Sequence, residues 1–133
     1  MSTPRRVMPD TSVWIIPPTA GMSGYGDEVA VSMVTIAELQ YGSTVSDQVE
    51  ALARRRRIRA ILDHHLVLPL DVPTTELYGA LAGMVRDAGR NPRPRRFDLL
   101  IAATAARHDM TLLTRDRDGF VGLERAVRVV QVE

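Results

Sequence analysis

The sequence predicts an α/β fold, a three-layer sandwich in which helices cover both faces of a mostly parallel sheet. Short apolar segments alternate along the chain with longer amphipathic ones, which is typical of strands alternating with helices. The apolar segments are hydrophobic almost throughout, as expected of strands that are covered on both faces. A chain of 133 residues has the size of one compact domain, so we expect a single domain over 1–133.

Five segments have the composition of strands. Pro17 and Pro18 end the first apolar run, in which we expect a strand that stops near Asp10. The other expected strands cover residues 28–34, 66–72, 111–114 and 126–132. A loop rich in glycine and small residues, 19–27, separates the first strand from the second.

Helices are expected between these strands. Thr35 is the expected N-cap of a short helix that ends before Gly42. A long helix is expected to begin after an N-cap at Ser46 or Thr44 and to end at about His65. The expected buried side of the long helix consists of Val49, Leu52, Ala53, Ile58, Ile61 and Leu62. Further helices are expected over 74–88 and 97–108, the latter apolar almost all round, whereas two prolines make 91–96 a basic, non-helical loop.

The composition excludes several classes of chemistry. All 17 basic residues are arginine, and without lysine the chain has no Schiff-base residue and no Walker A loop. Without cysteine it has no thiol nucleophile, disulfide or thiolate metal site. A net charge of +1 indicates no polyanionic partner by itself, and no apolar run approaches the length of a membrane span. We therefore expect a cytoplasmic protein without a membrane segment.

Four acidic residues stand apart from the solvated ones, because each lies at a strand end or a helix start: Asp10, Glu38, Asp98 and Asp116. Each has an ordinary explanation when taken alone, as a turn former, a first-turn helix acid or the partner of an arginine. In a parallel α/β sheet, however, these positions meet at one edge. Carboxylates gathered there would repel one another unless a cation neutralised them, and Mg²⁺ or Mn²⁺ suits such oxygen ligands. A phosphodiester is then the leading substrate, with a water activated by the metal as nucleophile.

At these acids the chain resembles the PIN-domain endoribonucleases and, within them, the VapC toxins of bacterial toxin-antitoxin pairs. The resemblance rests on four segments that occur in the family's order and span nearly the whole chain: residues 10–13 (DTSV), 32–42 (SMVTIAELQYG), 97–105 (FDLLIAATA) and 112–116 (LLTRD). It departs from the family at Pro9, where the first strand would continue, and after Trp14, where a loop replaces a clear helix.

The resemblance implies a PIN-like fold and a magnesium-dependent ribonuclease whose metal-binding, catalytic acids match Asp10, Glu38, Asp98 and Asp116. Ser12 matches the hydroxyl residue that supports the first acid, and Thr114 the one that precedes the fourth. Asp118 competes with Asp116 for the fourth position, and we place Asp116 first because it is nearer the strand end. The resemblance further implies cleavage of structured RNA, commonly tRNA or ribosomal RNA, a homodimer, and inhibition by a VapB-type antitoxin that covers the acidic cleft.

Arginines flank two of the four acids. They are candidates for binding RNA phosphates, although they could serve only to balance the acids: Arg93, Arg95, Arg96, Arg115 and Arg117. An alternative function is a catalytically silent PIN-like module that binds RNA or a protein partner. The sequence favours the enzyme, since a decayed site should have lost at least one of the four acids.

Overall fold

The computed structural model describes residues 3–133, so residues 1 and 2 of the expected domain lie outside the described part. In chain order the elements are β1 (Arg6–Pro9), α1 (Thr11–Ile15), β2 (Glu28–Ser32), α2 (Met33–Gly42), α3 (Gln48–His64), β3 (Leu66–Leu68), α4 (Val72–Asp87), the 3-10 turn η1 (Arg93–Arg95), α5 (Arg96–Arg107), β4 (Thr111–Thr114), the 3-10 turn η2 (Arg117–Phe120) and β5 (Val129–Gln131).

The strands form one parallel sheet in the order β3-β2-β1-β4-β5. β1 lies at the centre, where its residues 7–9 pair with residues 111–113 of β4. Its pairing with β2 covers Arg6 and Val7 and stops before Pro9, which has no N–H to donate. The predicted α/β class with a parallel sheet is confirmed.

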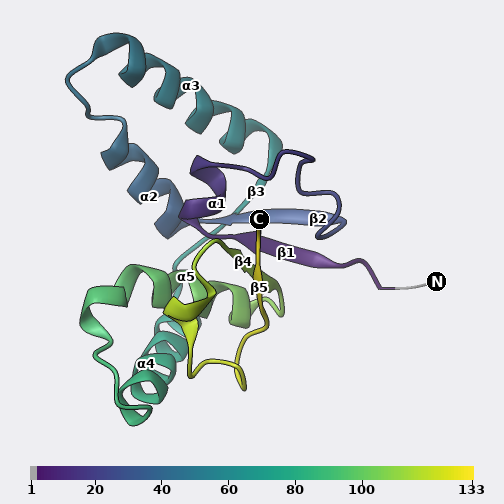
Figure 1. The fold of residues 1–133 in the computed structure, drawn as a ribbon, viewed down its shortest axis with the longest axis vertical. Coiled ribbons are helices and arrows are strands. Elements are labelled where there is room, and N and C mark those ends of the chain that lie inside the picture. Colours follow the sequence, from purple (N-terminus) through teal and green to yellow (C-terminus); the bar gives the residue numbers. More distant parts are fainter. Residues whose placement is uncertain (1–2) are drawn as a thin grey trace.

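Two helical layers enclose this sheet, with α4 and α5 on one side and α1, α2 and α3 on the other (Figure 1). Successive strand residues face opposite layers: Met8 and Leu112 pack in the cluster with α4 and α5, whereas Val31 packs with Trp14 and Ile58 on the other face. Both faces of the sheet are therefore apolar, which explains the hydrophobic character of the strand segments.

Three helices begin at other residues than their composition suggested, α2 and α4 earlier and α3 later. Ser32, rather than Thr35, caps α2 and accepts a hydrogen bond from the backbone N–H of Val34. Asp47, rather than Ser46 or Thr44, caps α3, and Asp71 caps α4, so that this helix starts at Val72. In each case the residue expected to cap or begin the helix and the observed N-cap lie within three residues of each other, and both have a side-chain oxygen that can cap a helix. The residue at which the preceding strand or loop ends decides which of the two becomes the N-cap.

Several expected bounds were wrong for related reasons. The strand expected over 28–34 stops at Ser32 because this residue already caps α2, and those expected over 66–72 and 126–132 contract to β3 and β5. A short helix, α1, follows the first strand where we expected none. Residues 93–95 form the 3-10 turn η1 although the segment was expected to be non-helical, since the fixed φ of proline suits the start of such a turn.

The expected buried side of α3 was wrong in its first half. Ile58 and Ile61 are buried as expected and Leu62 is partly buried, but Leu52 and Val49 are exposed, Val49 by 80%. Ala53 is exposed as well, and Ala51 takes its place in the interior. The start of α3 projects beyond the sheet together with the end of α2, and Ile58, Ile61 and Leu62 of its second half pack in the cluster with Trp14 and Val31 (Figure 1).

No helix within residues 3–133 combines the length and the apolar character that crossing a membrane requires.

Candidate functional site

Three of the singled-out acids lie at the same edge of the sheet. Asp10 directly follows β1, Asp116 follows β4 by two residues, and Glu38 lies in α2, which begins where β2 ends. Because β2, β1 and β4 are adjacent and parallel, their carboxyl ends meet at this edge. Asp98 lies in the first turn of α5, the helix that precedes β4 in the chain.

Asp10 is almost fully buried, with 4% of its surface exposed, and is held by neutral donors. Its Oδ1 accepts hydrogen bonds from the Ser12 hydroxyl at 2.5 Å and from the Val13 backbone N–H at 3.3 Å, as N-cap of α1. Ser12 Oγ in turn accepts the backbone N–H of Arg115 at 3.2 Å. One hydroxyl thus ties the end of β1 to the end of β4 and fixes the orientation of Asp10.

Glu38 is held in a similar way. Its Oε1 accepts a hydrogen bond of 2.6 Å from the hydroxyl of Thr11, the first residue of α1. Thr11 Oγ1 also lies 3.2 Å from the hydroxyl of Thr35, which is buried in α2. Thr11 was not among the site residues predicted from the sequence, and its position directly after Asp10 was the available indication.

Asp98 and Asp116 are held by a charge instead. The Arg95 guanidinium bridges them, with Nη1 at 3.1 Å from Asp98 Oδ2 and Nη2 at 3.0 Å from Asp116 Oδ2. The Asp116 backbone N–H also donates to the hydroxyl of Thr114 at 3.0 Å, which positions the turn that carries this acid. Asp116 is the more accessible of the pair, with 59% of its side chain exposed against 33% for Asp98.

The four carboxylates share one electrostatic environment. Burial raises the pKa of Asp98, and the negative charges of Asp10, Glu38 and Asp116 raise it further, whereas Arg95 acts in the opposite direction. Each of the other acids therefore lies near enough to disfavour the ionised form of Asp98. The site concentrates more negative charge than one arginine balances.

The chemistry of the donors suits a hard divalent cation. The four acids supply carboxylate oxygens, which Mg²⁺ and Mn²⁺ prefer. As the side chains are placed over residues 3–133, however, no three of them are close enough together to hold an ion, and the Arg95 guanidinium lies between two of the four. The acids therefore fit such an ion in kind, while Arg95 is bonded to one oxygen each of Asp98 and Asp116.

The remaining candidate arginines differ in their contacts. Arg115 points away from the acids, since its Nε and Nη2 both donate to the backbone carbonyl of Ile16 just after α1. Arg96 lies over the ring of Phe97, with its guanidinium carbon 5.6 Å from the ring centroid. Arg93 and Arg117 are exposed.

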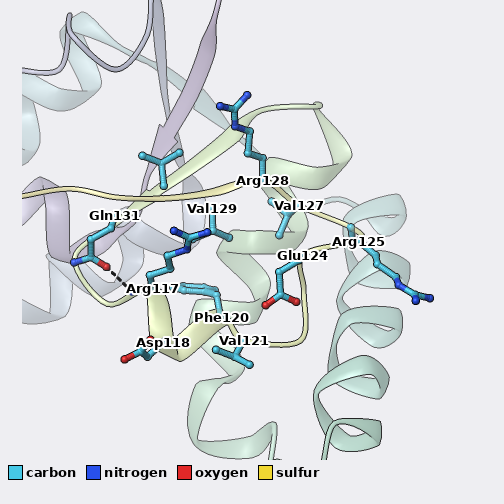
Figure 2. Close-up of a pocket in the computed structure, with 12 residues that line it drawn as sticks. Arg117, Asp118, Phe120, Val121, Glu124, Arg125, Val127, Arg128, Val129 and Gln131 are labelled. Atoms are coloured by element: carbon cyan, nitrogen blue, oxygen red, sulfur yellow. Dashed lines mark hydrogen bonds between the residues drawn. The ribbon is translucent and has the colours of Figure 1, made fainter.

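Asp118, unlike Asp116, lines a groove beside the second 3-10 turn, η2. The groove has a volume of about 740 Å³ and lies beside β5, and Arg117 and Glu124 line it as well (Figure 2). Gln131 fixes this turn, because its Oε1 accepts the backbone N–H of Arg117 at 2.8 Å (Figure 2). Of the two acids that compete for the fourth position, only Asp116 has contact with Arg95 among the described ion pairs.

The chain is similar to known proteins over most of its length. The profile of the PIN domain matches residues 7–126. Ribonuclease VapC4 of Mycobacterium tuberculosis is 35% identical over 119 residues, which cover 86% of this chain and 88% of the relative. Ribonuclease VapC5 of the same organism is 30% identical over 131 residues, covering 96% of this chain and 95% of the relative.

A solved structure extends the similarity to the fold. The crystal structure of VapBC-5 from Mycobacterium tuberculosis, a member of the VapBC family of toxin-antitoxin systems, contains a chain that superposes with a TM-score of 0.81 at 29% identity. The similarity covers 98% of this chain and 99% of that one. This chain therefore belongs to the PIN-domain family and, within it, to the VapC-type proteins.

Proposed function

We propose that this protein is a divalent-cation-dependent endoribonuclease, the toxin of a type II toxin-antitoxin pair. The names of the relatives, ribonucleases VapC4 and VapC5, support the reaction class. The substrate we propose is structured RNA, tRNA or ribosomal RNA, whose hydrolysis in the cytoplasm inhibits translation. The cation is Mg²⁺, and Mn²⁺ is a substitute.

One observation carries the proposal: the charges of Asp10, Glu38 and Asp116 all bear on Asp98, although these acids come from four separate parts of the chain. A structural role would favour acids that are dispersed or individually paired. A cluster that raises the pKa of one of its own members is costly for folding and is typical of a functional site.

The four acids would hold the cation, directly or through water. When bound, the ion would lower the pKa of a water molecule and neutralise charge on the scissile phosphate. Ser12 and Thr11 keep the carboxylates of Asp10 and Glu38 oriented through their hydrogen bonds. Thr114 positions Asp116 through the backbone of the following turn.

The exposed arginines beside the acids would bind the RNA backbone. Arg93 and Arg96 precede Asp98 in η1 and α5, and Arg117 follows Asp116 in η2, so that exposed arginines flank both of these acids in the chain. Guanidinium groups bind phosphate oxygens in a bidentate manner and make the affinity depend on salt. The backbone contact of Arg115 gives this residue a positioning role instead.

The proposed partner is a VapB-type antitoxin, and the proposed assembly includes a homodimer of this chain. An apolar hollow of about 370 Å³ adjoins Glu38 and is lined by Val34, Ala37, Tyr41 and Phe97. Tyr41 is 81% exposed and Phe97 50% exposed, so the hollow offers aromatic surface to a partner segment. A segment bound there would lie directly over the acidic site.

The test is cleavage of a defined RNA by the purified chain. Total tRNA is incubated with the protein and Mg²⁺, Mn²⁺ or EDTA, and the 5′ ends of the fragments are sequenced. Asp98→Asn should abolish cleavage while preserving the circular dichroism spectrum, because it removes one of the four acids. Glu76→Gln, at an exposed position of α4, is the matched loss of one negative charge and should cleave as the wild type does.

Two results would contradict the proposal. Cleavage by Asp98→Asn at the wild-type rate would show that the acid cluster is not the active site. Binding of RNA without any cleavage in Mg²⁺ or Mn²⁺ would favour the alternative, a catalytically silent RNA-binding module. Growth arrest on expression should likewise disappear with Asp98→Asn, and its persistence would separate toxicity from the acidic site.

A further inference from the structure

The guanidinium of Arg95 occupies a special position among the ion pairs of residues 3–133, because it alone contacts two acids. It reaches Asp98 through Nη1 and Asp116 through Nη2, at 3.1 and 3.0 Å. The other ion pairs of the described chain join one arginine to one acid on exposed surface. Arg95 is thus the chain's own cation at the place where a divalent ion is proposed to bind.

The guanidinium of Arg95 lies in the space left by the missing side chain of Gly119 in η2, and we call this space its seat. A Cβ atom at Gly119 would overlap Nη2 and Cζ of Arg95 and would lie 2.8 Å from Nη1. Gly119 is not among the glycines with positive φ, which within the described residues are Gly21, Gly89 and Gly122. Its backbone therefore does not require glycine, and the absence of a side chain serves to let the guanidinium lie against the turn.

The turn that carries Gly119 has other anchors. Arg90 Nη1 donates to the backbone carbonyl of Asp118 at 2.9 Å, and Gln131 holds the backbone of Arg117. Removing the guanidinium of Arg95 from its seat should therefore leave η2 in place. The position of Arg95 and the integrity of the turn can be tested separately.

We propose that Arg95 is a built-in latch, a positioning residue that holds Asp98 and Asp116 in the absence of metal and must leave them when a divalent cation binds. The inference rests on the proposed metal-dependent function. Arg95 is bonded to Oδ2 of each acid, and a divalent ion bound to the same carboxylates would lie a few ångströms from the guanidinium, where like charges repel strongly. The latch therefore weakens metal binding by the free chain.

An RNA phosphate offers Arg95 a competing partner. A guanidinium released from Asp98 and Asp116 can bind a phosphate near the acidic edge, so RNA and the cation bind more tightly together than separately. The latch makes loading of the metal depend on the presence of substrate.

Two variants remove the latch by different routes. Arg95→Met removes the charge, whereas Gly119→Ala retains the charge and expels the guanidinium from its seat. We expect Mn²⁺ affinity, measured by electron paramagnetic resonance of free Mn²⁺ and by calorimetry, to rise roughly tenfold in both. The expected gain in Gly119→Ala separates the latch from a general change in charge.

Matched controls exist for both variants. Arg56→Met removes an exposed arginine of α3, outside the acidic site, and should change Mn²⁺ affinity much less than Arg95→Met does. Gly24→Ala adds a methyl group where no heavy atom beyond the two neighbouring residues lies within 4 Å, and it should have no effect. Melting temperatures without metal report whether a variant has damaged the fold.

The outcomes separate the latch from the proposed function. Equal or weaker Mn²⁺ affinity in Arg95→Met and Gly119→Ala overturns the latch, while loss of Mn²⁺ binding in Asp98→Asn still supports the metal site. If Asp98→Asn binds Mn²⁺ as the wild type does, the metal site itself is wrong and the latch falls with it. A merely structural Arg95 would lower the melting temperature in both variants and would not tighten Mn²⁺ binding in either.

Discussion

The two halves of the acidic site are held by different forces. In the half formed by Asp10 and Glu38, neutral groups donate to the carboxylates: the hydroxyls of Ser12 and Thr11 and the backbone of Val13. In the half formed by Asp98 and Asp116, a cation of the chain itself bridges the acids. Neutral hydrogen bonds orient a carboxylate without cancelling its charge, whereas a guanidinium orients and neutralises it together.

This difference indicates that the halves have different tasks. The Asp10–Glu38 half is preorganised and keeps its full negative charge available to a cation. The Asp98–Asp116 half is closed by Arg95, and its acids become available only after the guanidinium moves. Removing a supporting group should therefore weaken cation binding in the first half and strengthen it in the second.

The largest effect is expected for Ser12→Ala in the first half. The change removes the hydrogen bond to Asp10 Oδ1 and also the acceptor for the Arg115 backbone N–H, so Asp10 loses its fixed orientation. Loss of such a supporting group costs about 10–100-fold in metal affinity or activity. Calorimetry with Mn²⁺ and initial cleavage rates measure both quantities.

Ser46→Ala, at an exposed position before α3, is the matched control and should bind Mn²⁺ as the wild type does. If Ser12→Ala bound Mn²⁺ more tightly, the two halves would respond alike, and the distinction between neutral and charged support would be lost.

The sequence predicted that the acids meet at one edge of the sheet, but not that they form two differently supported halves. The strand over residues 111–114 was placed correctly, because its apolar run lies between polar segments that cannot continue it. The carboxyl ends of parallel strands then bring Asp10, Glu38 and Asp116 to one edge, and this follows from topology alone.

The support of each acid depends on details that no local pattern contains. The bridge from Arg95 to Asp116 joins residues 21 positions apart and requires η1 and η2 to face each other. Thr11 contacts Glu38 only because α1 begins directly after Asp10, in a segment where no helix was expected. Local composition thus predicted which acids come together, whereas tertiary contacts determine which hydrogen bonds and ion pairs support each acid.

A smaller effect concerns stability and pH. The raised pKa of Asp98 means that the folded chain binds a proton more readily than the unfolded chain does, so this residue lowers stability as pH rises from the ordinary aspartate range through the raised pKa. In EDTA at neutral pH, Asp98→Asn should therefore raise the melting temperature by a few degrees at most, and the gain should shrink as the pH falls toward 4.

Thermal unfolding followed by circular dichroism between pH 4 and pH 7.5 measures this difference, with Glu76→Gln as the control for a lost acid outside the site. A drop in the melting temperature of Asp98→Asn at neutral pH would mean that the ion pair with Arg95 outweighs burial and repulsion. The bridge from Arg95 to Asp98 and Asp116 would then stabilise the fold, instead of keeping two acids from binding a cation.

The smallest effect is expected for Asp118→Asn, which tests where the second half ends. Asp118 follows Asp116 by two residues, but it lines the groove beside β5, and Arg95 contacts Asp116 instead. Mn²⁺ affinity should change by no more than about twofold in Asp118→Asn, since an exposed charge that does not itself contact the ion contributes little. Asp116→Asn removes an acid that Arg95 bridges and should weaken Mn²⁺ binding clearly more. If the two substitutions weakened binding equally, the metal-binding surface would extend into the groove, and the latch formed by Arg95 would cover only part of it.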